Sequence, residues 1–504
     1  MEGRSKTSIK DICCLALSLI LKDKVHFPGS PGYTASLGSY AALQEIAVEP
    51  RCIVTPKNTK DVSSAVRVLS TTTPAGSKGC QFAVRSGGHA AFAGAANIEG
   101  GVTLDLTGLN SVTVQQTTSN NEAPVISVGA GGRWGAVYSV LDPLNLAVNG
   151  GRAGSVGVGG LLLGGGLSFF GPRSGWSCDT VTNFEVVLFD GRVVNANADK
   201  NPDLLWALRG GTNNFGVVTR VDLQSFPQGD IWGGQTVHLI STLDAQINFL
   251  ASFSNPATYD EYSSLITSFA YNNPATGGPG MSITANQMEY TKPIANPSVF
   301  HGLTDDLPPP LFTTQRVTYL TDIVTEVAAG NPDGVFWQFS ASVTIKARLD
   351  AINATVQAWN RSIESISHIP GIIWAVVMDP LPPQLYAEHS DNGRANAFGL
   401  GARNNGESLI IVQLFASWPS PATGSPEALD EVVDLAARRL IADIETETKK
   451  LGALDRFIYA NYAAPWQGVF ESYGKESLKK LREVRKRYDP ARVFTKMVPG
   501  GFKF

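Results

Sequence analysis

The chain has 504 residues, a formal net charge of −4 and a hydrophobic fraction of 43%. This composition excludes a disordered or fibrous chain, and its charge gives no electrostatic footprint for nucleic acid. The longest apolar runs, such as 372–378, fall far short of the ~20 residues of a membrane-spanning helix, so we expect no membrane or nucleic-acid partner. The 51 glycines are about one residue in ten, above the ~7% of an average protein, and need a local explanation.

The first 24 residues admit two interpretations. Basic residues precede an apolar run at 12–21, an order typical of a signal peptide. However, Asp11 interrupts the junction, charged residues follow the run at once, and no small-x-small cleavage motif is present. We therefore favour an amphipathic first helix.

The cysteines and sequons leave the compartment open. Cys13 or Cys14 could form a disulfide with Cys52, which would need an oxidising compartment, and the sequons at Asn353 and Asn360 would fit one. Short sequons often arise by chance, so a cytoplasmic or vesicular location is slightly favoured over secretion. No pair of CxxC units offers a zinc site.

The next segment predicts a small α+β unit with a crossover helix. We expect strands at 52–54, 82–84, 102–106 and 125–128, and helices from Thr59 onward and at 134–141. The helix from Thr59 has apolar residues at positions 62, 65, 66 and 69, a spacing of three and four that buries one face.

Three glycine-rich stretches dominate the first half of the chain. Residues 85–89 follow a strand, and their consecutive glycines let backbone N–H groups converge on an anion, with His89 placed beside a ligand. Residues 150–171 hold ten glycines in 22 positions, a density that indicates neither ordinary helix nor strand. Within them, 156–166 alternates glycine with aliphatic residues, which suits backbone lying flat on a planar ligand. Residues 208–216 add amide side chains that could serve another part of that ligand.

Beyond residue 171 the pattern of the sequence changes. A hairpin at 184–194, a helix at 202–208 and a strand at 216–223 come first. Glycine then thins between about 231 and 454, where strands alternate with longer helices expected at 345–363 and 428–451. We interpret this region as a second domain. A basic helix at 475–488 follows, and its Lys and Arg residues are typical of a solvated face.

The glycine-rich stretches together indicate a long ligand with phosphates and a flat ring, which is a dinucleotide. A nicotinamide fingerprint is not satisfied, because Gly157 and Gly159 lack an acidic residue about twenty positions later in the right strand context. Asp179 stands near that distance but in a loop.

These stretches and the tail resemble a known family. Residues 85–89, 156–166 and 207–216, together with the tail motifs 459–462 and 488–490, are similar to the vanillyl-alcohol oxidase superfamily, with its PCMH-type FAD-binding domain. Within it the match is closest to the berberine-bridge-enzyme-like oxidases of fungal secondary metabolism. The resemblance implies an α+β fold with a two-part FAD-binding domain and a substrate domain whose antiparallel sheet is covered by helices. The implied boundaries are 1–228 and 455–504 for the first domain and 229–454 for the second.

The resemblance also implies the cofactor and its attachment. FAD would be joined covalently to the ring of His89. The cysteine that forms a second link in many relatives falls on Ala153, so we expect a single covalent link and a lower flavin potential. Val156 matches the position that admits oxygen to the flavin, which favours an oxidase. The predicted cofactor-binding residues are Arg85, Ser86, Gly87, Gly88, His89, Ala153, Gly154, Val156, Gly157, Gly159, Gly160, Gly164, Gly165 and Gly216.

The tail supplies the predicted catalytic residues, Tyr459, Asn461 and Tyr462. If this stretch is extended, Tyr459 and Asn461 point one way and Tyr462 the other. A tyrosine that acts as a base needs its pKa of ~10 lowered by its neighbours. Weaker candidates are Glu388, His389 and Gln413, whereas Cys80 and Cys178 are interpreted as buried thiols.

The sequence therefore predicts an FAD-linked oxidase of a small, largely hydrophobic metabolite. Oxygen would reoxidise the flavin and give hydrogen peroxide, and we expect a monomer or weak homodimer. Two alternatives stay open. One is a carbohydrate or alcohol oxidase on the same fold, and the other is a non-redox cyclase or pericyclase that uses FAD as a scaffold.

Overall fold

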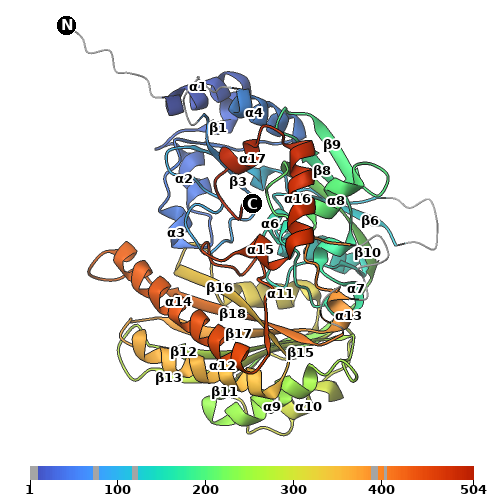
Figure 1. Cartoon of the computed structure of the whole chain (residues 1–504), viewed down its shortest axis with the longest axis vertical. Coiled ribbons are helices and arrows are strands. Elements are labelled where there is room, and N and C mark those ends of the chain that lie inside the picture. Colours follow the sequence, from blue (N-terminus) through green and yellow to red (C-terminus); the bar gives the residue numbers. More distant parts are fainter. Residues whose placement is uncertain (1–8, 72–78, 116–122, 388–394, 402–403, 405) are drawn as a thin grey trace.

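The computed structural model describes residues 9–71, 79–115, 123–387, 395–401, 404 and 406–504. The described strands form three sheets in an α+β fold, as predicted (Figure 1). Two sheets come from residues 25–227 and the third, larger sheet from residues 231–455. Among the described helices, none combines the length and the apolar character that crossing a bilayer requires.

The first sheet is parallel at its centre. In spatial order its strands are Val25–His26 (β1), Cys52–Val54 (β2), Val102–Asp105 (β4) and Phe82–Arg85 (β3). Helix α4 (Thr59–Thr71) connects β2 to β3, and both strands pair in parallel with β4. The crossover predicted from the spacing of apolar residues in α4 is thus confirmed. Two short helices, α2 (Pro31–Leu37) and α3 (Leu43–Ile46), precede β2.

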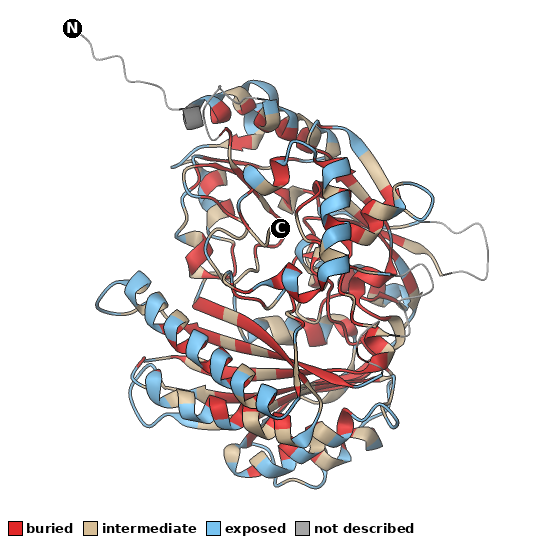
Figure 2. Cartoon of the chain, viewed as in Figure 1, coloured by how far each residue is buried: buried red, intermediate tan, exposed pale blue. Residues whose placement is uncertain are grey.

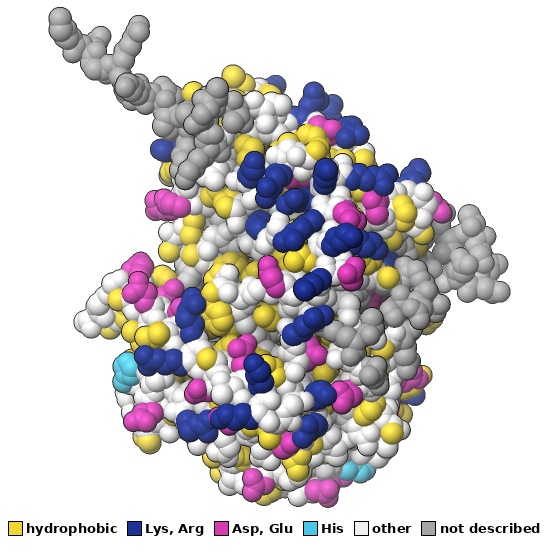
Figure 3. All heavy atoms as spheres, in the orientation of Figure 1, with side chains coloured by type: hydrophobic (Ala, Val, Ile, Leu, Met, Phe, Trp, Pro, Cys, Tyr) yellow, Lys and Arg dark blue, Asp and Glu magenta, His cyan; other side chains and the backbone are white. Residues whose placement is uncertain are grey.

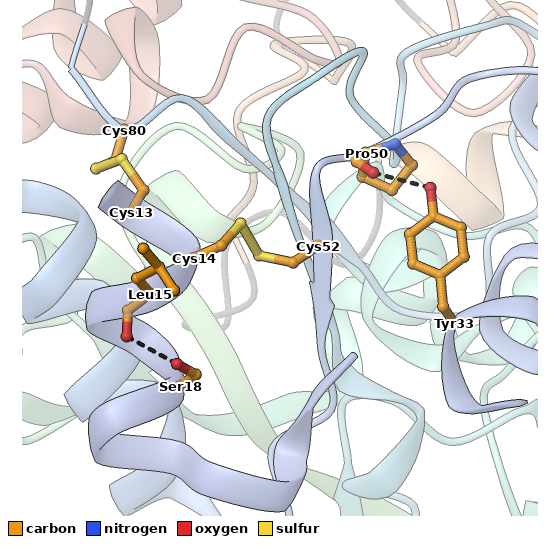
Figure 4. Close-up of a disulfide and its surroundings, with 8 residues drawn as sticks. All are labelled: Cys13, Cys14, Leu15, Ser18, Tyr33, Pro50, Cys52 and Cys80. Atoms are coloured by element: carbon orange, nitrogen blue, oxygen red, sulfur yellow. Dashed lines mark hydrogen bonds between the residues drawn. A yellow bond between two sulfur atoms is a disulfide. The ribbon is translucent and has the colours of Figure 1, made fainter. Parts of the chain in front are cut away.

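Two disulfides tie helix α1 (Ile9–Leu21) to this sheet (Figure 4). Cys14 is bonded to Cys52 in β2, and Cys13 to Cys80, two residues before β3. The predicted bond to Cys52 is therefore confirmed for Cys14. The interpretation of Cys80 as a thiol is wrong, because the adjacent cysteines of α1 reach two different segments, β2 and the residues just before β3. Cys178 is a buried free thiol, as expected.

The first helix is present, but it is not amphipathic. Leu17 and Leu21 are buried against the sheet and α4. On the opposite face, Leu15 is 51% exposed and Leu19 81% exposed. The helix is therefore apolar on both sides.

The second sheet is antiparallel. In spatial order its strands are Val112–Val114 (β5), Val125–Gly129 (β6), Val217–Pro227 (β10), Val181–Val187 (β8) and Val193–Asn197 (β9), with Leu146–Val148 (β7) paired to β10. The predicted hairpin is formed by β8 and β9. Helices α5 (Trp134–Leu141) and α8 (Pro202–Leu208) also match their predicted positions.

The glycine-rich segment 150–171 is more regular than its composition indicates. A short helix, α6 (Val158–Leu163), contains Gly159 and Gly160. A second short helix, α7 (Gly171–Ser174), begins at the last residue of the segment. Val158 and Leu162 are buried in the core. Their packing compensates for the low helix propensity of the glycines, so the expectation of no ordinary helix is wrong for six residues.

The third sheet is antiparallel throughout. In spatial order its strands are Phe312–Thr313 (β14), Ile231–Leu239 (β11), Met281–Tyr290 (β13), Ser263–Asn272 (β12), Ile373–Leu381 (β17), Leu409–Trp418 (β18), Trp337–Lys346 (β16) and Leu454–Asp455 (β19), with Arg316–Thr318 (β15) on β11. The helices between these strands are α9 (Leu243–Phe253), α10 (His301–Thr304), α11 (Leu320–Ala329), α12 (Leu349–Ser362), α13 (Pro383–Tyr386) and α14 (Pro426–Lys450). Of these, α11 and α13 bury their apolar side chains in the core of the first part of the chain. The helix expected from residue 345 begins later, because residues up to Lys346 pair with β18.

The two faces of the third sheet differ because side chains alternate along each strand. Val412 and Leu414 of β18 lie in the core beneath helices such as α12 and α14, whose outer faces are exposed (Figure 2). The intervening Gln413 and Phe415 face the opposite way and line a cavity. One face of this sheet thus holds the domain together, while the other is free to contact a ligand.

The tail returns to the first half of the chain. Helices α15 (Val469–Ser472), α16 (Lys475–Tyr488) and α17 (Val493–Lys496) lie against it (Figure 1). The Tyr488 hydroxyl donates to Asp203 at the start of α8, and the Phe82 N–H donates to the Met497 carbonyl. Basic side chains gather along the outer face of α16 (Figure 3).

Candidate active site

A cavity of about 510 Å³ lies where the glycine-rich loops, the third sheet and the tail meet. Of the predicted cofactor residues, those that line it are Ser86, Gly87, Gly88, His89, Ala153, Val156, Gly157, Gly159, Gly160 and Gly216. The predicted catalytic residues Tyr459, Asn461 and Tyr462 line it as well. The structure therefore brings together segments that are more than 300 residues apart in the sequence.

The first two glycine loops touch backbone to backbone. A Cβ atom on Gly87 would lie 2.5 Å from the Gly157 nitrogen, and one on Gly157 would lie 2.3 Å from the Gly87 nitrogen. Ser86 closes the same junction, since its hydroxyl donates to Ala130 O at 2.6 Å and accepts from Gly159 N at 3.2 Å. These glycines thus fix the relative position of the two loops.

Arg85 does not line the cavity. Its guanidinium is buried on the other side of the loop, where it donates to the carbonyl oxygens of Ser36 and Ser39. It also lies 3.8 Å from the ring centre of Tyr40 and 3.6 Å from Asp105. The prediction that Arg85 contacts the cofactor is corrected, because its side chain is used to anchor the loop.

Three predicted glycines also serve packing and not the cavity wall. Gly154 donates its N–H to Val324 O in α11. A Cβ atom on Gly164 would lie 2.0 Å from the Asn461 amide oxygen, and Gly165 has a φ of +113° beside Phe398. By contrast, nothing lies within 4 Å of a Cβ position on Gly160. Gly160 therefore faces open space in the cavity.

His89 stands on the cavity wall with a ring nitrogen 3.2 Å from the Ser155 hydroxyl. Burial lowers the pKa of His89, while Asp333 opposes this shift and Arg133 adds to it. The ring is therefore neutral near pH 7. A neutral imidazole keeps a nucleophilic nitrogen, which is the form that a covalent link to a cofactor requires.

The tyrosines predicted to be catalytic lie in a turn and not in an extended stretch. The Tyr462 N–H donates to Tyr459 O at 3.0 Å, and the two ring centres are 4.9 Å apart. The Tyr459 hydroxyl accepts from Gly166 N, Leu167 N and the Asn461 amide. Tyr459 and Asn461 therefore hold the second glycine loop against the tail.

Tyr462 belongs to a buried cluster of charged groups that sequence reasoning missed. Arg152 forms a 2.6 Å ion pair with Asp379 of β17 and donates to the Tyr462 hydroxyl at 2.7 Å. Burial disfavours charge on Arg152, but the Asp379 carboxylate outweighs it, so the pKa of Arg152 lies above its ordinary value. Two features of the sequence could have indicated this cluster: Arg152 is a charged residue within a glycine-rich run, and Asp379 is a charged residue within an apolar strand.

The pKa values of the two tyrosines do not meet the requirement for a free phenolate base. Burial raises the pKa of Tyr459 and of Tyr462 above the ordinary value, and Asp379 raises that of Tyr462 further. Both hydroxyls are therefore protonated at neutral pH. Any proton that Tyr462 accepts must be matched by one that it gives up.

The weaker candidates are only partly tested. Gln413 lines the cavity and donates to the Ser340 hydroxyl at 2.9 Å, which in turn donates to the Tyr462 carbonyl at 2.8 Å. Glu388 and His389 lie outside the described residues. Among the described residues, no cluster of histidine, cysteine or acidic side chains could hold a metal ion.

A buried carboxyl, Glu289 of β13, makes protein stability depend on pH. Burial raises the pKa of Glu289 to about 8. The folded state therefore binds this proton more tightly than the unfolded state does. The resulting stability is fully present below the pKa of the unfolded state and is lost as the pH rises through the folded-state pKa. We expect the melting temperature to fall by ~2 °C or more between pH 5.5 and 8.5. Glu289→Gln should flatten this slope, while Glu431→Gln, an exposed residue of α14, should not. Equal slopes in the three proteins would contradict the assignment.

The cavity fits a dinucleotide. Its loops offer backbone at Gly87 and Gly157, open space at Gly160 and a neutral His89 ring on one continuous wall. Fold and site together define an FAD-binding oxidoreductase. Family models for an FAD binding domain and for a berberine and berberine-like domain match residues 50–197 and 458–497.

Comparisons with known proteins place the chain more narrowly. It is 35% identical over 500 residues to the FAD-dependent monooxygenase CTB5 of Cercospora beticola, covering 97% of this chain and 91% of the relative. It is 37% identical to oligopeptidase PhomG' of Diaporthe leptostromiformis over 96% of this chain, but it spans only 36% of that relative. The chain belongs to the berberine-bridge-enzyme-like family of FAD-linked oxidoreductases.

The fold is shared with a solved oxidase. The glucooligosaccharide oxidase of Acremonium strictum, a protein with a 6-S-cysteinyl, 8α-N1-histidyl FAD, superposes with a TM-score of 0.72. The alignment covers 96% of this chain and 98% of that one, at 22% identity. At this identity the likeness defines the fold alone.

Proposed function

We propose that the protein is an oxidase of a small, neutral and largely hydrophobic metabolite, with FAD attached once, through His89. When bound, FAD supplies the acceptor for a hydride and the return of electrons to oxygen as hydrogen peroxide. The observation that carries the proposal is a single cavity shared by the loop of His89 and the ligand-facing side of the third sheet. Val156 stands on the same wall, where we propose that it admits oxygen.

The lining of the sheet side supports the substrate class. Ile266, Val377 and Phe415 give it an apolar surface, and Gln413 and Ser340 add a few polar groups. The charge of Arg152 is already paired with Asp379. An apolar ligand with one or two hydroxyl groups fits such a wall better than a sugar does, because each buried sugar hydroxyl would need its own hydrogen-bond partner.

Tyr462 is the group we propose to move the substrate proton. The substrate O–H proton would pass to the Tyr462 oxygen while the Tyr462 proton passes to Asp379, which lies beside it. This exchange needs no free phenolate and therefore agrees with the raised pKa of Tyr462. Arg152 holds both partners, while Tyr459 keeps the loop in place.

Removing the Tyr462 hydroxyl should slow flavin reduction by ~10²–10⁴-fold, the usual contribution of a positioned acid or base. The measurement is the rate of flavin bleaching under anaerobic conditions, with Tyr462→Phe compared with wild type. Tyr319→Phe, an exposed residue, serves as the matched control. A rate for Tyr462→Phe within threefold of wild type would remove Tyr462 from the mechanism.

The reaction class can be tested with two panels of probes. Benzylic and allylic alcohols should bleach the flavin anaerobically and consume oxygen in air, whereas cello- and xylo-oligosaccharides should do neither. Bleaching by the oligosaccharides alone would replace the proposal with carbohydrate oxidation. Product formation without bleaching or oxygen uptake would instead show a non-redox cyclase with FAD as a scaffold.

A further inference from the structure

The last part of the tail, residues 500–504 (the tail segment), lies on the third glycine loop. The Asn213 amide donates to Gly500 O at 3.3 Å, and the Asn214 amide donates to Phe502 O at 3.0 Å. Lys503 donates to the Asn213 side-chain oxygen at 2.7 Å. The side-chain amides of Asn213 and Asn214, which the sequence predicted to serve a ligand, therefore bind the chain itself.

The tail segment is also part of the cavity wall. Gly501 and Phe502 line the cavity, and the Phe502 ring lies 6.1 Å from the ring of Phe92, which lines it from the loop that continues the first glycine stretch toward β4. Gly500 packs against the same loop, since a Cβ atom there would lie 2.3 Å from Gly94 O. The segment thus bridges the first and third loops over the cavity.

The neighbouring walls are fixed by regular structure. Val217 and Val218 belong to β10, which is hydrogen-bonded to β8 and β6 along its length and is buried. The tail segment has no helix or strand and is held by side-chain hydrogen bonds, including one from Arg485 to the Phe504 carbonyl, and by ring contacts. Segments with few backbone bonds open at a lower free-energy cost than paired strands, so this wall opens more readily than β10.

We propose that the tail segment is the removable wall of the FAD cavity. It undocks to admit the cofactor, docks onto Thr212, Asn213 and Asn214 once FAD is in place, and then blocks release. By thermodynamic reciprocity, bound FAD must stabilise the docked segment as much as the docked segment stabilises bound FAD. The inference depends on FAD binding and not on the oxidation proposed above.

The wall can be tested in a protein without the covalent tether. We expect His89→Ala/Phe502→Ala to release FAD at least tenfold faster than His89→Ala, as followed by flavin fluorescence after dilution. The matched control is His89→Ala/Phe226→Ala, which removes an aromatic ring of β10 that packs on Phe170 and does not line the cavity. Equal release rates for the Phe502 and Phe226 variants would overturn the proposal.

A second measurement needs no change in the tail. The His89→Ala protein is stripped of FAD, and amide hydrogen exchange of residues 498–504 is compared before and after FAD is added back. The proposal predicts at least tenfold slower exchange with FAD bound. Exchange that is the same in both states would overturn it, whether or not any substrate is ever found.

Discussion

Acid precipitation of the wild-type protein should carry its flavin into the pellet, whereas His89→Ala should leave all of it in the supernatant. The reason is the neutral His89 ring on the cavity wall, which can hold the cofactor by a bond that survives unfolding. His301→Ala, an exposed histidine far along the chain, is the control and should behave as wild type. Flavin retained by the His89→Ala pellet would mean that another residue forms the link.

The expectation of a single covalent flavin link can be tested by introducing the cysteine that would form a second one. Ala153 lines the same cavity as His89, at the position that resembles the cysteine of doubly linked relatives. Ala153→Cys in the His89→Ala background should return flavin to the pellet. In the wild-type background, Ala153→Cys would give both links. The reduction potential of its flavin should lie above that of the wild type, because a second electron-withdrawing bond favours the reduced ring. Ala153→Ser, the control, should neither return flavin to the pellet in the His89→Ala background nor raise the flavin potential in the wild-type background.

Loss of the disulfides should lower the free energy of unfolding more than any of the other substitutions. The bonds close separations of 67 and 38 residues, and the chain-entropy model gives about 4 kcal/mol for loops of such lengths. We expect Cys14→Ser and Cys13→Ser each to shift denaturant unfolding to lower concentration, and dithiothreitol to do the same to wild type.

The free thiol provides the control for that experiment. Cys178→Ser keeps both disulfides and should therefore respond to dithiothreitol as wild type does. Unfolding midpoints that are unaffected by reductant would contradict the expected stabilisation. Because such bonds persist in oxidising surroundings, we propose a vesicular location over a cytoplasmic one.

The sequence predicted the features that depend on neighbouring residues. The apolar spacing of α4, the hairpin of β8 and β9 and the three glycine-rich loops are local patterns, and the structure contains each of them. The strand–helix boundary near residue 346 was misplaced, since pairing with β18 and not local propensity decides where β16 ends.

The rest of the site depends on contacts between distant segments. Arg152 and Asp379 are 227 residues apart, so no local pattern could indicate that they pair. The roles of individual glycines were equally hidden. Gly160 faces open space, whereas Gly164 makes room for Asn461, and only tertiary packing distinguishes a glycine that admits a ligand from one that admits a neighbour.

The third sheet places the cavity lining and the hydrophobic core on opposite faces of the same strands. Ile266, Val377 and Gln413 stand on three adjacent strands and face the cavity, while Val376, Val412 and Leu414 face the helices. Substitutions on the cavity face leave the core untouched, because alternate residues of a strand point to opposite sides. Side chains on the cavity face can therefore be exchanged one at a time to change the cavity lining, while the core beneath the helices keeps its packing.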